Sequence, residues 1–377
     1  MSTAARPGSP RAGRLTRVVP RRPETGLVGL IVVMTVLAAL VMADFRTARN
    51  FNEMANDAAQ IAVLAVGEAV VILARQIDLS VGAILGLSAY LVGSAVGHLS
   101  GPLSPILGTV MALGLGAALG LGNAWLVDQM RMPAIIATLA TLSIYSGLQI
   151  VVTGGSELYV SQVPAWLANL RSASWFGVGP FIWIAFISLV VVSFLMRRTR
   201  FGRDVYAMGS NPEAARYLGI RFKLRTYEAF ALCGALAGLG GLLYTSAYGN
   251  VDATAGNGME LTVIATAVIG GVSLFGGSGT PFGAVLGAVL LIEIETVLAL
   301  LKISIFAEQT LEGAAIVLAV AIYAVASRRL RRPVRREQAG SEEEESSPAR
   351  GAVLVTSPPR AAGSALDGLA TDQISNA

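Results

Sequence analysis

Residues 26–43 read GLVGLIVVMTVLAALVMA, eighteen consecutive residues without a charged side chain. A helix of about 20 predominantly apolar residues is long enough to cross the hydrocarbon core of a bilayer. Similar runs recur, and the sequence predicts spans at 26–43, 57–74, 79–98, 104–127, 134–152, 180–196, 227–245, 261–275, 281–300 and 311–326. We therefore expect an all-α polytopic membrane protein with about ten transmembrane helices.

The composition of the 377 residues also favours a membrane protein, because 54% are hydrophobic and only 14% are charged. Soluble domains carry about 25% charged residues. The 42 glycines favour helices that pack closely through small residues. With one Cys and one His, the chain lacks the residues for an internal disulfide, a cysteine-based metal cluster or an HExxH zinc site. We expect neither a cofactor nor a metal.

Two of the expected spans are interrupted by polar or glycine-rich sequence. One begins just after Asp78, and the other ends just before Gly276. Irregular backbone at membrane depth is tolerated only where protein or a water-filled cavity surrounds it. Each of these segments is therefore a candidate broken or re-entrant helix.

The positions of Arg and Lys orient the spans, because cytoplasmic loops of membrane proteins are enriched in both. If both termini are cytoplasmic, 24 of the 28 basic residues lie in cytoplasmic segments. The exceptions are Arg46, Arg49, Arg171 and Lys302, and the excess persists without the two tails. The basic residues thus set the topology, and we expect no nucleic-acid partner.

Three regions follow from this topology. We expect a cytoplasmic N-terminal tail at 1–25, a transmembrane domain at 26–327 and a cytoplasmic C-terminal tail at 328–377. The first apolar run is longer than a signal-peptide core and is expected to be a retained span. The C-terminal tail combines a basic cluster, the acidic run 342–345 and Ser/Pro/Ala/Gly-rich sequence, a composition typical of disorder.

The longest charged cytoplasmic loop, 197–225, contains the signals of a short helix. Asn211 suits the N-cap, Pro212 the first helical position and Glu213 the positive end of the helix dipole. Gly219 suits the left-handed residue just past the end. So short a helix is unstable alone in water and must pack on the membrane domain or on a partner. It is either an ordinary interfacial helix or a coupling helix that transmits the motion of a cytoplasmic protein. Apolar surface for its packing would come from Tyr206, Met208, Tyr217, Leu218 and Ile220.

Three separated motifs resemble one protein family. The stretches are TRFGR and VYAMGSNPEAAR at 199–203 and 205–216, GEAVVIL and IDLSVG at 67–73 and 77–82, and GMEL and VIGGVSLFGGSGT at 258–261 and 268–280. Together they resemble the permease subunits of ribose-type ABC sugar transporters over roughly 26–330. Arg75-Gln76 departs from the Gly-Gly or Arg-Gly that many members have there.

The resemblance implies a bacterial-type cell membrane protein that is a transport subunit and not an enzyme. Its expected partners are a second permease subunit, identical or related, cytoplasmic ATPase subunits, an extracytoplasmic sugar-binding protein and membrane lipid. The chain has no GxxxxGK[ST] phosphate loop, so ATP hydrolysis is expected on a separate chain. The expected ATPase-coupling residues are Arg203, Asn211, Pro212, Glu213, Ala214, Ala215 and Gly219.

Polar groups at membrane depth are candidate pathway or gating residues, because they are costly there. Glu68 either binds a neighbouring helix or lines the pathway, and Asp78 and Ser80 either cap the next helix or contact the solute. The glycine-rich run before 281 is a candidate hinge near the cytoplasmic face, and Asn123, Thr138, Thr141 and Ser143 are candidate wall groups. The resulting pathway or gating set is Glu68, Asp78, Ser80, Asn123, Gly270, Gly271, Gly276 and Gly277.

The leading hypothesis is ATP-driven import of a monosaccharide or a similar small polar solute. Within the family, autoinducer 2 or another non-sugar solute is an alternative. A secondary transporter that uses Glu68 and Glu293 for ion coupling, and a membrane enzyme acting on lipid-linked substrates, are the competing classes.

Overall fold

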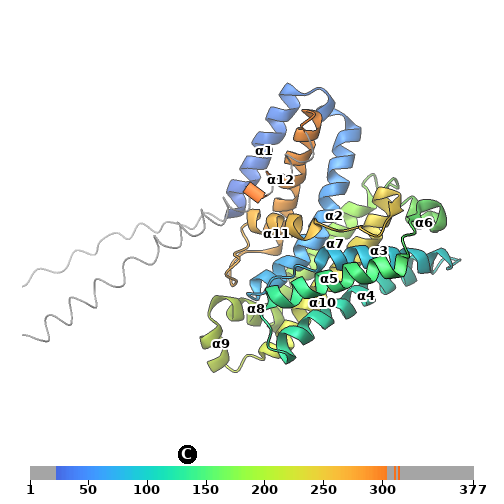
Figure 1. Ribbon diagram of the computed structural model, residues 1–377. Coiled ribbons are helices and arrows are strands. Elements are labelled where there is room, and N and C mark those ends of the chain that lie inside the picture. The colour runs from blue at the N-terminus through green and yellow to red at the C-terminus, as the bar shows by residue number, and fades with distance from the viewer. Residues whose placement is uncertain (1–22, 304–309, 311–312, 315–377) are drawn as a thin grey trace, which may run out of the picture. The chain divides into compact units, whose positions relative to one another are not determined.

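The computed structural model describes residues 23–303, 310 and 313–314, and the structural statements below concern these residues. Seven of its helices are long and apolar enough to cross a bilayer. They are α1 (Pro23–Val41), α2 (Ala48–Leu73), α4 (Ser104–Gln129), α5 (Ala134–Thr153), α7 (Pro180–Arg198), α10 (Phe222–Tyr248) and α12 (Pro281–Leu300) (Figure 1). Two shorter helices, α3 (Val81–Gly97) and α11 (Met259–Ile269), are also apolar.

The remaining elements are short and connect these helices. They are η1 (Asp44–Arg46), β1 (Leu158–Tyr159), η2 (Val160–Gln162), α6 (Ala165–Ala168), α8 (Arg200–Ser210), α9 (Pro212–Tyr217) and β2 (Asn250–Val251). The two strands pair antiparallel, with Leu158 opposite Val251. They tie the loop after α5 to the loop after α10.

The prediction of an all-α polytopic membrane protein is confirmed. Nine of the ten expected spans coincide with helices, and the two suspected breaks are the places where the short helices α3 and α11 occur. The expected span at 311–326 and the two tails lie largely or wholly outside the described residues, so the number ten and the sides of the termini stay predictions.

Two helix boundaries differ from the expected ones for local reasons. Helix α2 begins at Ala48 and not at 57, because the Thr47 hydroxyl caps it by accepting the Asn50 N–H at 3.2 Å. Helix α11 ends at Ile269 and not at 275, because Gly271, with φ 88°, turns the chain there. The glycine run therefore terminates a helix instead of continuing it.

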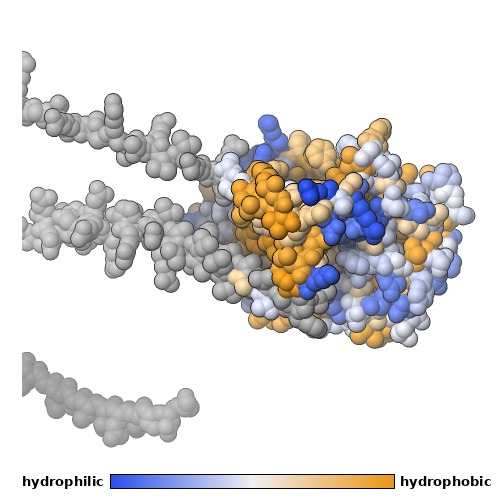
Figure 2. Space-filling view, turned by 90° about the horizontal axis from the view of Figure 1, so that it is seen from above, coloured by the Kyte–Doolittle hydropathy of each residue, from blue (hydrophilic) through white to orange (hydrophobic). Residues whose placement is uncertain are grey.

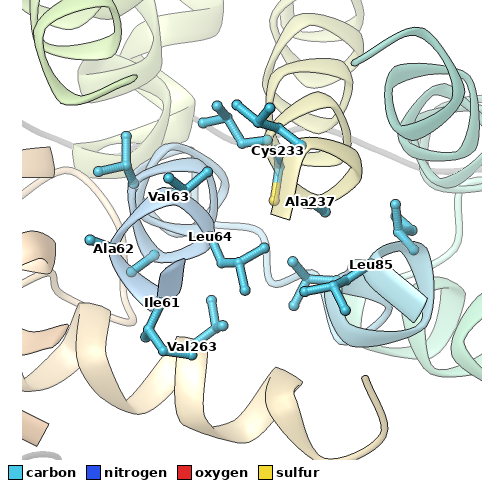
Figure 3. Close-up of a cluster of buried hydrophobic side chains, with 14 of the residues drawn as sticks. Ile61, Ala62, Val63, Leu64, Leu85, Cys233, Ala237 and Val263 are labelled. Atoms are coloured by element: carbon cyan, nitrogen blue, oxygen red, sulfur yellow. The ribbon is translucent and has the colours of Figure 1, made fainter. Parts of the chain in front are cut away.

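Helix α2 is the centre of the described bundle. Its apolar stretch is 94% buried, whereas the corresponding stretch of α1 is 6% buried. Figure 3 shows α2 side chains such as Leu64 among Leu85 of α3, Cys233 of α10 and Val263 of α11. A helix that is apolar on every side is expected where other helices surround it, and α2 is enclosed in this way.

The outer helices of the bundle expose apolar residues instead. On α5, for example, Ile136, Leu139 and Val151 are all more than half exposed. Figure 2 shows hydrophobic residues over large parts of the visible surface, with hydrophilic residues gathered in patches between them. Such a surface suits lipid, which is the environment that the composition requires.

A glycine seam joins α4 and α10, the pair of helices with the most extensive contact. Gly116 and Gly120 of α4 face Gly234 of α10 so closely that a side chain at Gly116 would collide with the Gly234 carbonyl. Small residues at transmembrane helix interfaces permit this approach of two backbones.

The contacts between loops sort into two ends of the bundle, in agreement with the expected alternation of sides. At one end Arg171 binds Asp57 at 2.8 Å and β1 pairs with β2. At the other end the Gly277 N–H donates to the Leu73 carbonyl, and Thr280 donates to Glu24 at 3.0 Å. Figure 1 places α8 and α9 at the end opposite α6.

We expect Gly116→Leu to destabilise the bundle by about 1–3 kcal/mol, because the added side chain forces α4 away from α10. The matched control is Gly114→Leu on the same helix, since nothing lies within 4 Å of a side chain placed there. The thermal unfolding midpoint of the purified protein in detergent measures the difference. Equal midpoints for the two variants would show that the seam does not hold the helices together.

Candidate functional site

Helix α9 has the caps that its sequence predicts. The Asn211 side chain accepts the Ala214 N–H at 3.0 Å, and Pro212 occupies the first turn. Gly219 has φ 74°, the left-handed conformation that glycine adopts without strain just past a helix end. The predicted loop helix is therefore present at Pro212–Tyr217.

One face of α9 packs on the protein and another is bare. Ala215 is buried, and the Arg216 guanidinium lies 5.2 Å from the centre of the Phe222 ring. Tyr217 and Leu218, by contrast, are 93% and 78% exposed. Arg203, Glu213 and Ala214, which belong to the expected coupling set, are exposed as well.

Helix α8 connects α9 to both interruptions of the bundle. A side chain at Gly209 would collide with the Leu73 carbonyl and with Gly277, so the end of α8 touches the turn after α2 and the turn before α12. The Tyr206 hydroxyl donates to the Gly279 carbonyl at 2.8 Å. Burial raises the pKa of Tyr206, which keeps this hydroxyl protonated and able to donate.

Gly276 and Gly277, two of the expected hinge residues, lie in this contact. Both have positive φ, and Gly276 packs against Arg75, which itself has φ 64°. Arg75 is thus a non-glycine residue in a left-handed turn, a conformation that is uncommon for residues other than glycine. Gly270 packs on Gly283 at the start of α12, and Gly271 supplies the turn after α11.

The four polar members of the pathway set come together in one buried cluster, which we call the polar cluster: Glu68, Asp78, Ser80 and Asn123. All four are fully buried. Glu68 Oε1 accepts the Asp78 N–H at 3.1 Å, and Asp78 Oδ1 accepts the Ser80 hydroxyl at 2.7 Å. The Asn123 amide donates to both Asp78 oxygens at 3.2 Å and to Ser80 Oγ at 2.8 Å.

The expected capping role is only half correct. Asp78 does accept the free Ser80 N–H at 2.9 Å, but the Ser80 side chain makes no capping bond to α3 because it is turned toward Asp78. Thr138 also joins the turn, donating to the Ile77 carbonyl at 3.1 Å. The polar cluster therefore bridges the break between α2 and α3, and the role of its members in the pathway or in gating stays a prediction.

Glu293 takes no part in this cluster. Its Oε1 accepts the Thr35 hydroxyl at 2.7 Å, which joins α12 to α1. Among the described residues no hydrogen bond connects Glu68 with Glu293, so the two carboxyls lie in separate contacts of the bundle.

A polar cavity of about 610 Å³ lies between α2, α10, the segment 254–262 and α12. We call it the outer cavity, because its residues belong to the half of the bundle that the charge pattern places outside. Its polar lining residues are Asp57, Gln60, Arg171, Tyr244, Tyr248, Thr254, Asn257, Thr262, Glu295 and Thr296. Sequence reasoning did not select these residues as a site, since they are distant in the chain and only helix packing brings them together.

These features define a class of protein, namely a many-helix membrane transport subunit with a small capped helix exposed at one end. Residues 50–326 match the family described as "Branched-chain amino acid transport system / permease component". The chain is 38% identical over 276 residues to the autoinducer 2 import system permease protein LsrC of Yersinia pseudotuberculosis serotype O:1b (strain IP 31758). The same protein of Yersinia pestis (strain Pestoides F) gives the same identity, and in both cases 73% of this chain and 77% of the relative are covered. No solved structure matches.

The chain belongs to this permease family. It is thus a permease subunit of an ATP-binding-cassette importer, a multi-pass inner membrane protein and a transport subunit, not an enzyme. Permeases of this kind work with an ATPase, a binding protein and another permease. The resemblance found in the sequence is confirmed.

We expect Asp78→Ala to lower stability by about 3 kcal/mol or more, because it leaves several buried donors of the polar cluster without an acceptor. Asp252→Ala is the matched control. Asp252 makes the same pair of hydrogen bonds to the residue two positions later, since it accepts the N–H and the hydroxyl of Thr254 at 2.7 and 2.9 Å. These bonds are exposed, whereas those of Asp78 are buried. We expect the control to cost only about 0.5–1.5 kcal/mol. Similar losses of thermal stability in the two variants would contradict a special role of the buried cluster.

Proposed function

We propose that this chain forms the solute pathway of the importer and that α9 is the element that enters a cytoplasmic ATPase subunit. The observation that carries the proposal is the exposure of Tyr217 and Leu218 on a capped helix. A six-residue helix with two bare apolar side chains is stabilised by a partner that covers them. The expected coupling residues Arg203, Asn211, Pro212, Glu213, Ala214, Ala215 and Gly219 then build, cap or flank this helix.

The route from α9 into the membrane supports the same assignment. A shift of α9 moves α8, and the end of α8 is in backbone contact with the turns at Leu73 and Gly277. One of these turns leads to the polar cluster and the other to α12. Motion imposed by the ATPase is thus passed to both interruptions of the bundle at once, and Gly270, Gly271, Gly276 and Gly277 are the gating hinges in this mechanism.

The proposed topology has ten spans and both termini in the cytoplasm. The excess of Arg and Lys supports it, and so does the sorting of loop contacts into two ends. In this topology α8 and α9 face the cytoplasm, whereas Arg171 and the β1–β2 pair face outward.

The proposed solute is a monosaccharide or a related small polar molecule, delivered by an extracytoplasmic binding protein. The relatives described above are named for import of autoinducer 2, and this solute is the first within-family alternative. The second permease is an identical copy or a related chain.

The double change Tyr217→Ala and Leu218→Ala is expected to abolish co-purification of the ATPase chain, because it removes the exposed apolar contacts of α9. The unfolding midpoint should stay nearly constant, since both side chains are exposed. Phe176→Ala, which removes a 97% exposed aromatic residue from the loop before α7, serves as the control and should retain the ATPase. Retention of the ATPase by the double variant would refute the coupling role.

Cysteine labelling tests the topology, because the one native cysteine, Cys233, is buried. A membrane-impermeant maleimide should label Phe176→Cys in spheroplasts and Leu218→Cys only in inside-out vesicles from cells that lack the ATPase subunits. The parent protein should stay unlabelled in both preparations. Labelling of Leu218→Cys in intact spheroplasts would place α9 outside and exclude the proposed coupling.

A further inference from the structure

We propose that the outer cavity is the site where the permease holds its solute, and that it takes neutral, hydroxyl-rich molecules in preference to anions and branched-chain amino acids. The inference rests on the proposed function and adds to it a location and a solute chemistry. The volume of the outer cavity, about 610 Å³, falls within the roughly 300–1,000 Å³ that small-molecule binding sites occupy.

The first observation is a buried donor without a partner. Gln60 lines the cavity and is 2% exposed, and its Nε2 has no hydrogen-bond partner among the described residues. A buried amide left unpaired is costly. A solute oxygen in the cavity would satisfy it, which gives the site a reason to prefer a molecule with acceptors.

The second observation is the interrupted helix below the cavity. Gly256 and Gly258 have φ 84° and 89°, and α11 begins directly after them at Met259, so the N-terminal end of α11 forms part of the wall. Helices broken at membrane depth with a terminus directed at the pathway are typical of transporter binding sites. At this terminus the Gly258 N–H already donates to Glu260 at 3.1 Å, so an additional anion is not required.

The charges of the lining argue against an anionic solute. Among the described lining residues the one guanidinium is that of Arg171, and it is already bound to Asp57 at 2.8 Å. A phosphate or carboxylate brought into this cavity would have to compete with the Asp57 carboxylate for this cation.

The remaining lining suits a sugar-like ring. Tyr244 and Tyr248 lie with ring centroids 4.3 Å apart, and both border the cavity. A tyrosine ring offers an apolar face and a hydroxyl together, which matches a molecule that carries C–H and O–H groups on one frame. The aliphatic side chain of leucine would instead leave the Gln60 amide unpaired, and sites built to hydrogen-bond reject such analogues strongly.

A second polar cavity supplies the matched control. It also measures about 610 Å³, borders the same helix one turn earlier and contains Asn56, whose buried Oδ1 likewise lacks a partner among the described residues. Its rim holds Arg49 and Glu53, which are bound to each other at 2.7 Å. Asn56→Leu and Gln60→Leu therefore remove similar amides from neighbouring cavities.

The experiment uses the full transporter complex in nanodiscs, with Asn257→Cys as a reporter at the cavity lining. Methyl methanethiosulfonate modifies this cysteine, while the buried Cys233 stays unreactive. We expect ribose or autoinducer 2 to slow the modification, and ribose 5-phosphate and leucine to leave its rate unchanged. Gln60→Leu should raise the concentration needed for half-protection by about three- to tenfold, whereas Asn56→Leu should change it by less than about twofold.

Protection by neither neutral solute would overturn the proposal, and so would equal protection by leucine or ribose 5-phosphate. An effect of Asn56→Leu that equals that of Gln60→Leu would overturn the assignment to this cavity.

The coupling function is read separately, from co-purification of the ATPase, which Gln60→Leu should not alter. A complex that keeps its ATPase but shows no protection refutes the cavity alone. If the solute protects the cysteine but the variant with Tyr217→Ala and Leu218→Ala keeps its ATPase, only the coupling role of α9 is refuted.

Discussion

A bilayer supplies no water to an interrupted helix, so the protein itself must satisfy every polar group exposed by the break. This constraint acts at two places in the bundle, between α2 and α3 and around α11. At the first, Glu68, Asp78 and Asn123 bind the turn through hydrogen bonds in a fully buried setting, and among the described residues only Asn123 Oδ1 of this cluster lacks a partner. At the second, glycines turn the chain at both ends of α11, and its backbone packs on α3 and α12.

The same constraint explains why the glycines of α3 and α12 occur in a repeated pattern. Gly82 and Gly86 near the start of α3 face the backbone at Gly256 and Ala255, while Gly283 and Gly287 near the start of α12 face Gly270 and Thr266. Both helices follow a short polar turn, and both use two glycines one turn apart to let the backbone of α11 or of its flanking turn lie against them. The similarity of GAILG at 82–86 and GAVLG at 283–287 thus has a matching structural role.

What the sequence predicts well is local. The spans follow from apolar runs, because each run must leave water along its whole length, and the caps of α9 follow from Asn211, Pro212 and Gly219, which act within one turn. The expected start of this span at residue 57 is wrong, because the polar residues before Asp57 already belong to α2, which Thr47 caps. The partners of Asp78 and the lining of the outer cavity depend on which helices are neighbours. Asn123 lies 45 residues from Asp78, and nothing in the local pattern of either residue specifies the other.

Helix α2 passes through all three functional regions, and this gives the proposed mechanism its geometry. Gln60 borders the outer cavity, Glu68 holds the polar cluster and Leu73 binds the turn that α8 touches. At 1.5 Å per residue, Gln60 lies about 12 Å from Glu68 and about 20 Å from Leu73 along the helix axis. Because the apolar stretch of α2 is enclosed by other helices, it cannot bend without disturbing α7, α10 and α12, which pack on it most extensively. In the proposed mechanism, a displacement imposed at Leu73 therefore moves the helix as a unit, and the wall of the cavity at Gln60 moves with it.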